Sequence, residues 1–278
     1  MSKFICLTNS DKVKYRIVCI GAGGNGSHFF RNMCQDVRSY LNVKDDLSVD
    51  ITIVDADIVE QKNIGNQVFT SDDIGEPKVV CLAERYGEAY DLNIKRVVQY
   101  CRDIEMLQKL FANVNETFEI PILISMVDNN RSRQLFDDFF YSTYLESLIY
   151  LDAGIEGVDE TLSIEDQNRS GFSGQVVVGF KWKGRVLLEP VTRVYENIMN
   201  DNNTIFPGES CSDLIVNHPQ RCNTNKFAAQ IANSFINNLF HTRTIFWHYV
   251  NFNSQLCLSK PTYIEPAAID LFNTLEKS

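Results

Sequence analysis

The stretch IVCIGAGGNGSHFF, residues 17–30, decides how the first half of the chain folds. An apolar run from Ile17 to Ile20 leads into the six residues 21–26, four of which are glycines, and an apolar-rich helical pattern follows. A strand, a glycine turn and a helix in this order bring backbone N–H groups and a helix N-terminus to a phosphate. The stretch therefore indicates a nucleotide site, but it does not choose between NAD, FAD and ATP.

Strand and helix patterns alternate through the rest of the first half. Strand patterns lie at residues 15–20, 49–54, 95–98, 120–127 and 148–152. Helical patterns lie between them, at residues 26–41, 77–90, 104–112 and 131–144. This alternation predicts an α/β fold with a doubly wound, Rossmann-like and mostly parallel sheet.

The pattern changes after Gly154 and predicts an antiparallel hairpin extension. In order, it consists of a hairpin over 174–190, a polar loop over 199–222, a helix over 223–239 and a hairpin around 253–254. The absence of a linker or repeat favours one domain over residues 1–278. We expect its nucleotide-binding part at about 14–152 and a partner-binding and crossover-loop part at about 153–278.

Composition excludes several classes of protein. The 278 residues carry a net charge of −10, which argues against a general nucleic-acid or anionic-membrane binder. The sequence contains no run of about 18 apolar residues, so a membrane-spanning helix is not predicted. The first residues also lack the pattern of a secretory signal, and we expect a cytoplasmic protein. The eight cysteines form no CxxC pair, which argues against a zinc ribbon and a disulfide framework. Most of them, such as Cys19, are expected to be small buried hydrophobes.

Charged residues follow the predicted strands in a telling order. Asp55 follows the strand at 49–54, Lys78 comes shortly after, and Asp128 follows the strand at 120–127. Because the carboxyl ends of parallel strands share one crevice, these side chains should converge with Gly24. An ammonium, two carboxylates and glycine N–H groups suit Mg·ATP better than a hydride carrier. The structural alternatives are a plain tight turn, a solvated lysine, and Asp128 as a helix cap.

The motifs GxGGxG, DxDxVxxxN, Q, GxxK and DNxxxR follow one another from about residue 14 to 152. Their order resembles the ThiF/MoeB and ubiquitin-activating enzyme superfamily, in its short bacterial type. The resemblance implies an ATP-dependent adenylyltransferase that activates the C-terminal carboxylate of a ubiquitin-like or sulfur-carrier protein. Many such enzymes then transfer the acyl group to a cysteine as a thioester.

The resemblance also implies roles for individual residues. Glycines would approach the nucleotide, Asp55 would hold the ribose, and Asp128 would hold magnesium. The residues implied for ATP binding are Gly21, Gly23, Gly24, Gly26, Asp55, Asp57, Asn63, Gln67 and Lys78. Lys78 and Asp128 would act in catalysis, whereas Arg133 would make a structural contact. The stretches 152–157 and 174–176 would line the groove for the partner's tail, which we expect to bind there by strand addition.

A thioester step needs an accessible thiol near the adenylate. Cys211, in the polar loop, is the first candidate, and Cys222 is the second because a helix N-terminus favours a thiolate. A loop cysteine without a role is the alternative. The four histidines (His28, His218, His241 and His248) lack metal spacing, and we assign them structural roles.

One departure from the family pattern leaves two other functions open. The family usually carries Arg before the Gln, but this chain has Asn66. The alternatives are therefore a catalytically weak partner subunit that binds a ubiquitin-like protein, or an NAD- or FAD-dependent oxidoreductase. The distance from the glycines to Asp55 exceeds the roughly 20 residues of a usual NAD fingerprint and counts against the latter. The resemblance further implies a homodimer. The short chain has no obvious ubiquitin-fold domain, so we expect any downstream transfer enzyme, of the ubiquitin-conjugating type, to be separate.

Overall fold

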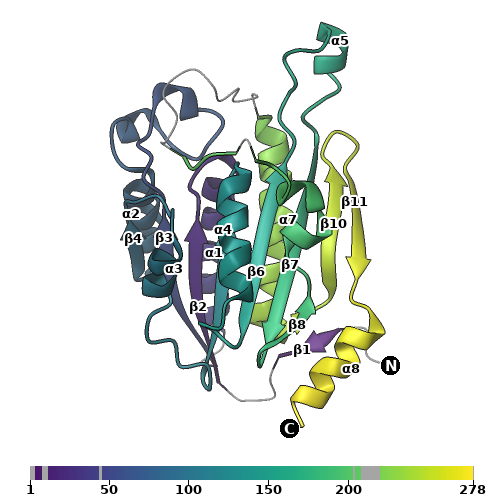
Figure 1. The fold of residues 1–278 in the computed structure, drawn as a ribbon. Helices are drawn as coiled ribbons and strands as arrows, with labels where there is room; N and C mark the ends of the chain where they lie inside the picture. The colour runs from purple at the N-terminus through teal and green to yellow at the C-terminus, as the bar shows by residue number, and fades with distance from the viewer. Residues whose placement is uncertain (1–3, 8–11, 44–45, 203, 208–219, 278) are drawn as a thin grey trace.

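A computed structural model describes residues 4–7, 12–43, 46–202, 204–207 and 220–277. Within this part of the chain, nine strands form one sheet (Figure 1). Five of them run parallel and adjoin in the order β6-β5-β2-β3-β4. Their bounds are β2 Val13–Ile20, β3 Leu47–Val54, β4 Ile94–Val97, β5 Glu119–Ser125 and β6 Leu148–Ile155. The predicted doubly wound α/β sheet is confirmed.

The antiparallel strands extend the sheet beyond β6. They are β7 Ser173–Trp182, β8 Arg185–Leu188, β10 Trp247–Asn253 and β11 Leu258–Tyr263. The order is β6-β7-β10-β11, with β8 also paired to β7, so β4 and β11 are the outermost strands. The turn between β7 and β8 lies at Lys183-Gly184, where both residues have positive φ, as a tight hairpin turn requires.

Helices cover both faces of the sheet (Figure 1). One core lies between the sheet and the helices α1 (Gly24–Leu41), α2 (Lys78–Tyr90), α7 (Cys222–Thr242) and α8 (Pro266–Leu275). The other core lies between the opposite face and the helices α3 (Ile104–Leu110), α4 (Asn130–Tyr141) and α6 (Val191–Val194). Strand β2 is buried on both sides: Ile17 and Cys19 face the first core, and Val18 faces the second. Two-sided burial explains the near-continuous apolar runs of the parallel strands.

Several elements were not expected from the sequence. Helix α8 packs Phe272 against Phe180 and Trp182, with ring centroids 6.1 and 5.9 Å apart. A two-stranded pair joins β1 (Ile5–Cys6) to β9 (Thr244–Ile245), and the short α5 (Ile164–Gln167) lies on a projecting arm (Figure 1). Single helical turns lie at η1 (Gln61–Asn63), η2 (Ser71–Asp73) and η3 (Glu196–Ile198).

Strand addition at residues 174–176 is ruled out by the sheet order. Val176 pairs with Ala153 of β6 on one side and with Val250 of β10 on the other. Gln175 is likewise flanked on both sides. Because β7 is an inner strand, it offers no free backbone edge to a partner's tail, and the expectation of strand addition at 174–176 was wrong. At 152–157 it stays a prediction, since residues 153–155 of β6 pair with β7 alone among the described strands.

Among the described residues, no helix is both long enough and apolar enough to cross a membrane.

Candidate nucleotide and acyl site

The glycine turn between β2 and α1 packs tightly against its own backbone. A Cβ on Gly26 would lie 2.0 Å from the carbonyl oxygen of Gly21, so only glycine fits there. Among the described residues, nothing lies within 4 Å of where a Cβ on Gly23 would be, and no side chain caps the start of α1. The turn is therefore closed on its inner side and open at Gly23, beside helix N–H groups that favour an anion.

Asp55, the first residue after β3, fastens this turn. Its carboxylate accepts the N–H of Ala22 at 2.6 Å and the N–H of Asp57 at 2.8 Å. Burial raises the pKa of Asp55, and the nearby charge of Asp57 adds to the effect. Asp55 thus positions the turn, a role that the motif reading did not include.

Lys78 begins α2 and is almost fully buried, with 5% of its surface exposed. Its ammonium lies 2.9 Å from a carboxylate oxygen of Asp57, and the hydroxyl of Tyr100 donates to the other oxygen. Burial opposes ionisation of Asp57, but the charge of Lys78 and the two hydrogen bonds outweigh it and lower its pKa. Burial and the bond to Asp57 raise the pKa of Tyr100, so its hydroxyl keeps its proton. Lys78 is therefore a fixed, charged donor at this edge of the sheet.

Sequence reasoning missed Tyr100. Its position after β4, the strand next to β3, was the available signal, because side chains after neighbouring parallel strands meet at one edge.

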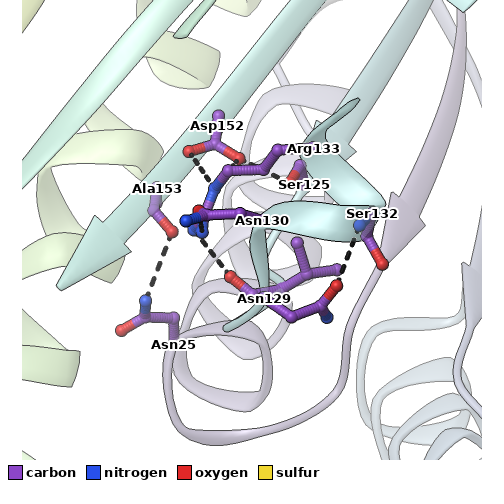
Figure 2. Close-up of polar contacts among 9 residues, drawn as sticks. Asn25, Ser125, Asn129, Asn130, Ser132, Arg133, Asp152 and Ala153 are labelled. Atoms are coloured by element: carbon purple, nitrogen blue, oxygen red, sulfur yellow. Dashed lines mark hydrogen bonds and ion pairs between the residues drawn. The ribbon is translucent and has the colours of Figure 1, made fainter. Parts of the chain in front are cut away.

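The junction of β5 and α4 is built on a buried ion pair (Figure 2). The Nε of Arg133 lies 3.0 Å from a carboxylate oxygen of Asp152, which also accepts from Ser125 at 2.6 Å. A second nitrogen of Arg133 donates to the carbonyl of Val127 at 2.7 Å. The pair therefore fixes the backbone that carries Asp128.

Asp128 itself is exposed at the end of β5. The side chain of Asn129 caps α4 by accepting the N–H of Ser132 at 2.8 Å, so Asp128 is not the cap. The structural alternative for Asp128 is thereby excluded, and its carboxylate faces solvent at the same edge as the glycine turn.

Three asparagines, Asn25, Asn66 and Asn225, lie around the start of α1. Asn25 donates to the carbonyl of Ala153 at 3.4 Å, and its oxygen points away from that strand (Figure 2). The side-chain nitrogen of Asn225, on α7, donates to the side-chain oxygen of Asn66 at 3.5 Å. The Asn225 amide also lies against Gly24, within 2.7 Å of the position that a Cβ on Gly24 would take. The neutral ring of His28, whose pKa burial lowers, contacts the carbonyl of Asn66 at 3.3 Å.

A sequence model described as the ThiF family matches residues 4–212, three quarters of the chain. The chain belongs to the ThiF family. No curated protein sequence matches it.

Solved structures with the same fold include PaaA and Escherichia coli MccB. PaaA is 15% identical with a TM-score of 0.54, and the match covers 91% of this chain and 64% of PaaA. MccB determined with ATP is 15% identical with a TM-score of 0.53, and MccB determined with succinimide is 13% identical with a TM-score of 0.56. Each match covers 91% of this chain and 64% of MccB. The likeness shows the fold, and this ThiF-family chain spans 64% of the length of these structures.

The remaining predicted residues of the ThiF-family pattern are placed as follows. Asn63 is buried, and its side-chain oxygen accepts the N–H of Glu60 at 2.8 Å, which closes the η1 turn. Gln67 has a buried Oε1 with no donor among the described residues. Cys222 is half-buried as the first residue of α7, whereas Cys211 lies outside the described residues. Across the part of the chain that the structure describes, no cluster of three His, Cys, Asp or Glu side chains could hold a metal.

Proposed function

We propose that this ThiF-family chain is an ATP-dependent adenylyltransferase. Its substrate would be the C-terminal carboxylate of a small partner, a ubiquitin-like or sulfur-carrier protein. One observation carries the proposal: the uncapped start of α1, open at Gly23, and the buried ammonium of Lys78 occupy the same edge of a parallel sheet. Both groups stabilise negative charge on phosphates. The helix start would serve NAD as well as ATP, so the buried ammonium of Lys78 is the group that favours ATP.

The residues present fit Mg·ATP. The start of α1 offers helix N–H groups to phosphates. Asp55, at the end of the neighbouring strand β3, is the type of residue that holds ribose hydroxyls. Magnesium is commonly bound through one or two carboxylates together with phosphate oxygens and water, so the exposed carboxylate of Asp128 suits it. When bound, the ion would offset charge on the phosphates.

The reaction that this arrangement supports begins with attack of a carboxylate oxygen on the α-phosphorus of ATP. The bond between that phosphorus and the oxygen bridging to the β-phosphate breaks, and pyrophosphate leaves with the electron pair. Lys78 and the N–H groups of α1 would stabilise the charge that develops, and the fixed turn would hold the α-phosphate in line. In a following step a thiolate, of Cys211 or Cys222, would attack the acyl carbon and release AMP.

Calorimetry with Mg·ATP and with NAD tests the proposal without knowledge of the partner. Mg·ATP should bind, NAD should not, and Lys78→Ala and Asp128→Ala should each weaken Mg·ATP binding about tenfold or more. Matched controls are Lys62→Ala and Asp72→Ala, which remove exposed charges from the same region. NAD binding in place of Mg·ATP would favour the oxidoreductase and overturn the proposal.

A second candidate, a catalytically weak partner subunit, is favoured by Asn66 alone. This residue stands where the family usually has an arginine, and here it contacts Asn225 instead. If the missing guanidinium limits catalysis, Asn66→Arg should raise the rate of ATP–pyrophosphate exchange. An unchanged rate, in a protein that exchanges pyrophosphate, would count against this candidate.

A further inference from the structure

The ammonium of Lys78 has more hydrogen-bonding capacity than the protein itself uses. An ammonium group has three N–H donors. In the part of the chain that the structure describes, its one acceptor is a carboxylate oxygen of Asp57, 2.9 Å away. Two donors are thus left for a ligand, on a side chain that keeps 6% of its surface exposed. How much of the positive charge a ligand meets then depends on how the Asp57 carboxylate is held.

Tyr100 fixes the orientation of that carboxylate. The backbones of Asp57 and Lys78 are already joined, because the N–H of Lys78 donates to the carbonyl of Asp57 at 2.9 Å. What could still rotate is the side chain of Asp57, which Lys78 binds at one oxygen and the Tyr100 hydroxyl binds at the other. A carboxylate held in this way cannot turn both of its oxygens toward the ammonium.

The ring of Tyr100 is itself held in place. The guanidinium carbon of Arg102 lies 5.0 Å from the ring centroid, a favourable placement of a cation over an aromatic face. Arg102 in turn donates to the carbonyl of Pro207 at 2.6 Å. The hydroxyl of Tyr100 is therefore a fixed donor directed at Asp57.

We propose that Tyr100 is a positioning residue that sets how strongly Lys78 binds phosphate. This inference rests on the proposed function and adds to it a residue outside the sequence motifs. By holding one oxygen of Asp57, Tyr100 prevents the carboxylate from accepting a second hydrogen bond from the ammonium. Two N–H donors and part of the positive charge of Lys78 then stay available to phosphate. Tyr100 acts through Asp57 and needs no contact of its own with the nucleotide.

Calorimetry with Mg·ATP on the variant Tyr100→Phe tests the proposal. Phenylalanine keeps the ring beside Arg102 and removes only the hydroxyl. The Asp57 carboxylate can then turn both oxygens toward Lys78, so the Kd of Mg·ATP should rise about tenfold, the size of one hydrogen bond to a charged group. The matched control is Tyr144→Phe, which removes a hydroxyl that donates to the carbonyl of Gln108 at 2.8 Å and should bind Mg·ATP as wild type does.

A double-variant cycle separates positioning from packing. In an Asp57→Asn background no carboxylate charge remains to be oriented, so adding Tyr100→Phe should change the Kd by a factor of about one. A loss of the same size in both backgrounds would show an effect of packing alone and would overturn the proposal.

Carbon NMR of the Asp57 carboxyl group gives a second readout, which a packing role of Tyr100 would not change. Burial raises the pKa of Asp57, whereas the charge of Lys78 and then the hydrogen bond from Tyr100 lower it. Tyr100→Phe should accordingly raise this pKa, and an unchanged pKa would contradict the proposal.

Titration of wild type with Mg·ATP comes first. If wild type does not bind Mg·ATP, the proposed function fails and the role of Tyr100 fails with it. If wild type binds and Tyr100→Phe has the same affinity, only the role of Tyr100 is refuted.

Discussion

Replacing Asp152 by asparagine should destabilise the whole protein, because it leaves the charge of Arg133 buried without its partner. Both side chains are almost fully enclosed, and the carboxylate of Asp152 takes hydrogen bonds from Arg133 and from Ser125. Asparagine keeps the shape and one acceptor oxygen but removes the negative charge. The perturbation is therefore mainly electrostatic.

The expected loss in the free energy of unfolding is about 3 kcal/mol. Removing one partner of a buried ion pair costs about 3–5 kcal/mol, and the retained acceptor of asparagine places this variant at the lower end. For a domain of this size, such a loss lowers the midpoint of thermal unfolding by roughly 6–12 °C. It is a large part of a total stability of about 5–15 kcal/mol.

Urea unfolding followed by tryptophan fluorescence measures this loss. The matched control is Arg169→Ala, which breaks an exposed pair with Glu165 and should cost less than about 0.5 kcal/mol. The double variant Arg133→Met with Asp152→Leu should recover part of the loss, because it leaves no unpaired charge. A loss below about 1 kcal/mol for Asp152→Asn would refute the reasoning, since the pair would then behave like a surface one.

Three other predictions concern the glycine turn and the ion pair of Lys78. Gly26→Ala should lower the free energy of unfolding by about 2 kcal/mol or more, measured in urea, because its Cβ would lie 2.0 Å from the carbonyl of Gly21; an unchanged urea midpoint would contradict this. Gly23→Ala should leave the free energy of unfolding within about 0.5 kcal/mol of wild type and weaken Mg·ATP binding in calorimetry. An unchanged affinity for Mg·ATP would refute phosphate binding at this turn. The pKa of Asp57 lies below its unfolded value of 3.8, so its charge stabilises the folded state above that pH and this contribution fades as pH falls through the lowered pKa. The stability advantage of wild type over Asp57→Asn should accordingly be present at pH 7 and shrink below about pH 4, and an advantage that grows on acidification would reverse the assignment.

Local patterns predicted the elements that carry the proposed phosphate site. The apolar run before the glycines, the turn and the helix after it are contiguous in sequence, so neighbouring residues alone determine them. The observed β2 begins two residues earlier than predicted and ends at the same residue, Ile20. The alternation of strands and helices likewise predicted a parallel sheet, because crossover helices leave few other arrangements.

Contacts between distant residues were not predictable in this way. Asn225 reaches the glycine turn from 200 residues away because α7 packs beside α1. The cap of α4 is Asn129 and not its neighbour Asp128, a choice that depends on backbone geometry at one residue. Strand addition at Gln175 failed as a prediction because the pattern of a strand says nothing about which strands flank it.

The outermost strands of the sheet order, β4 and β11, each have one backbone edge that no other described strand of the sheet pairs with. Strand β11 carries Pro261, which has no N–H to donate, next to the charged Lys260. Strand β4 is four residues long and carries Lys95 and Arg96, both exposed. Proline, charge and shortness all disfavour growth of a sheet from one molecule into the next. These features of β4 and β11 are expected to disfavour edge-to-edge association, and the proposed binding site lies away from both edges, at the carboxyl ends of the inner strands.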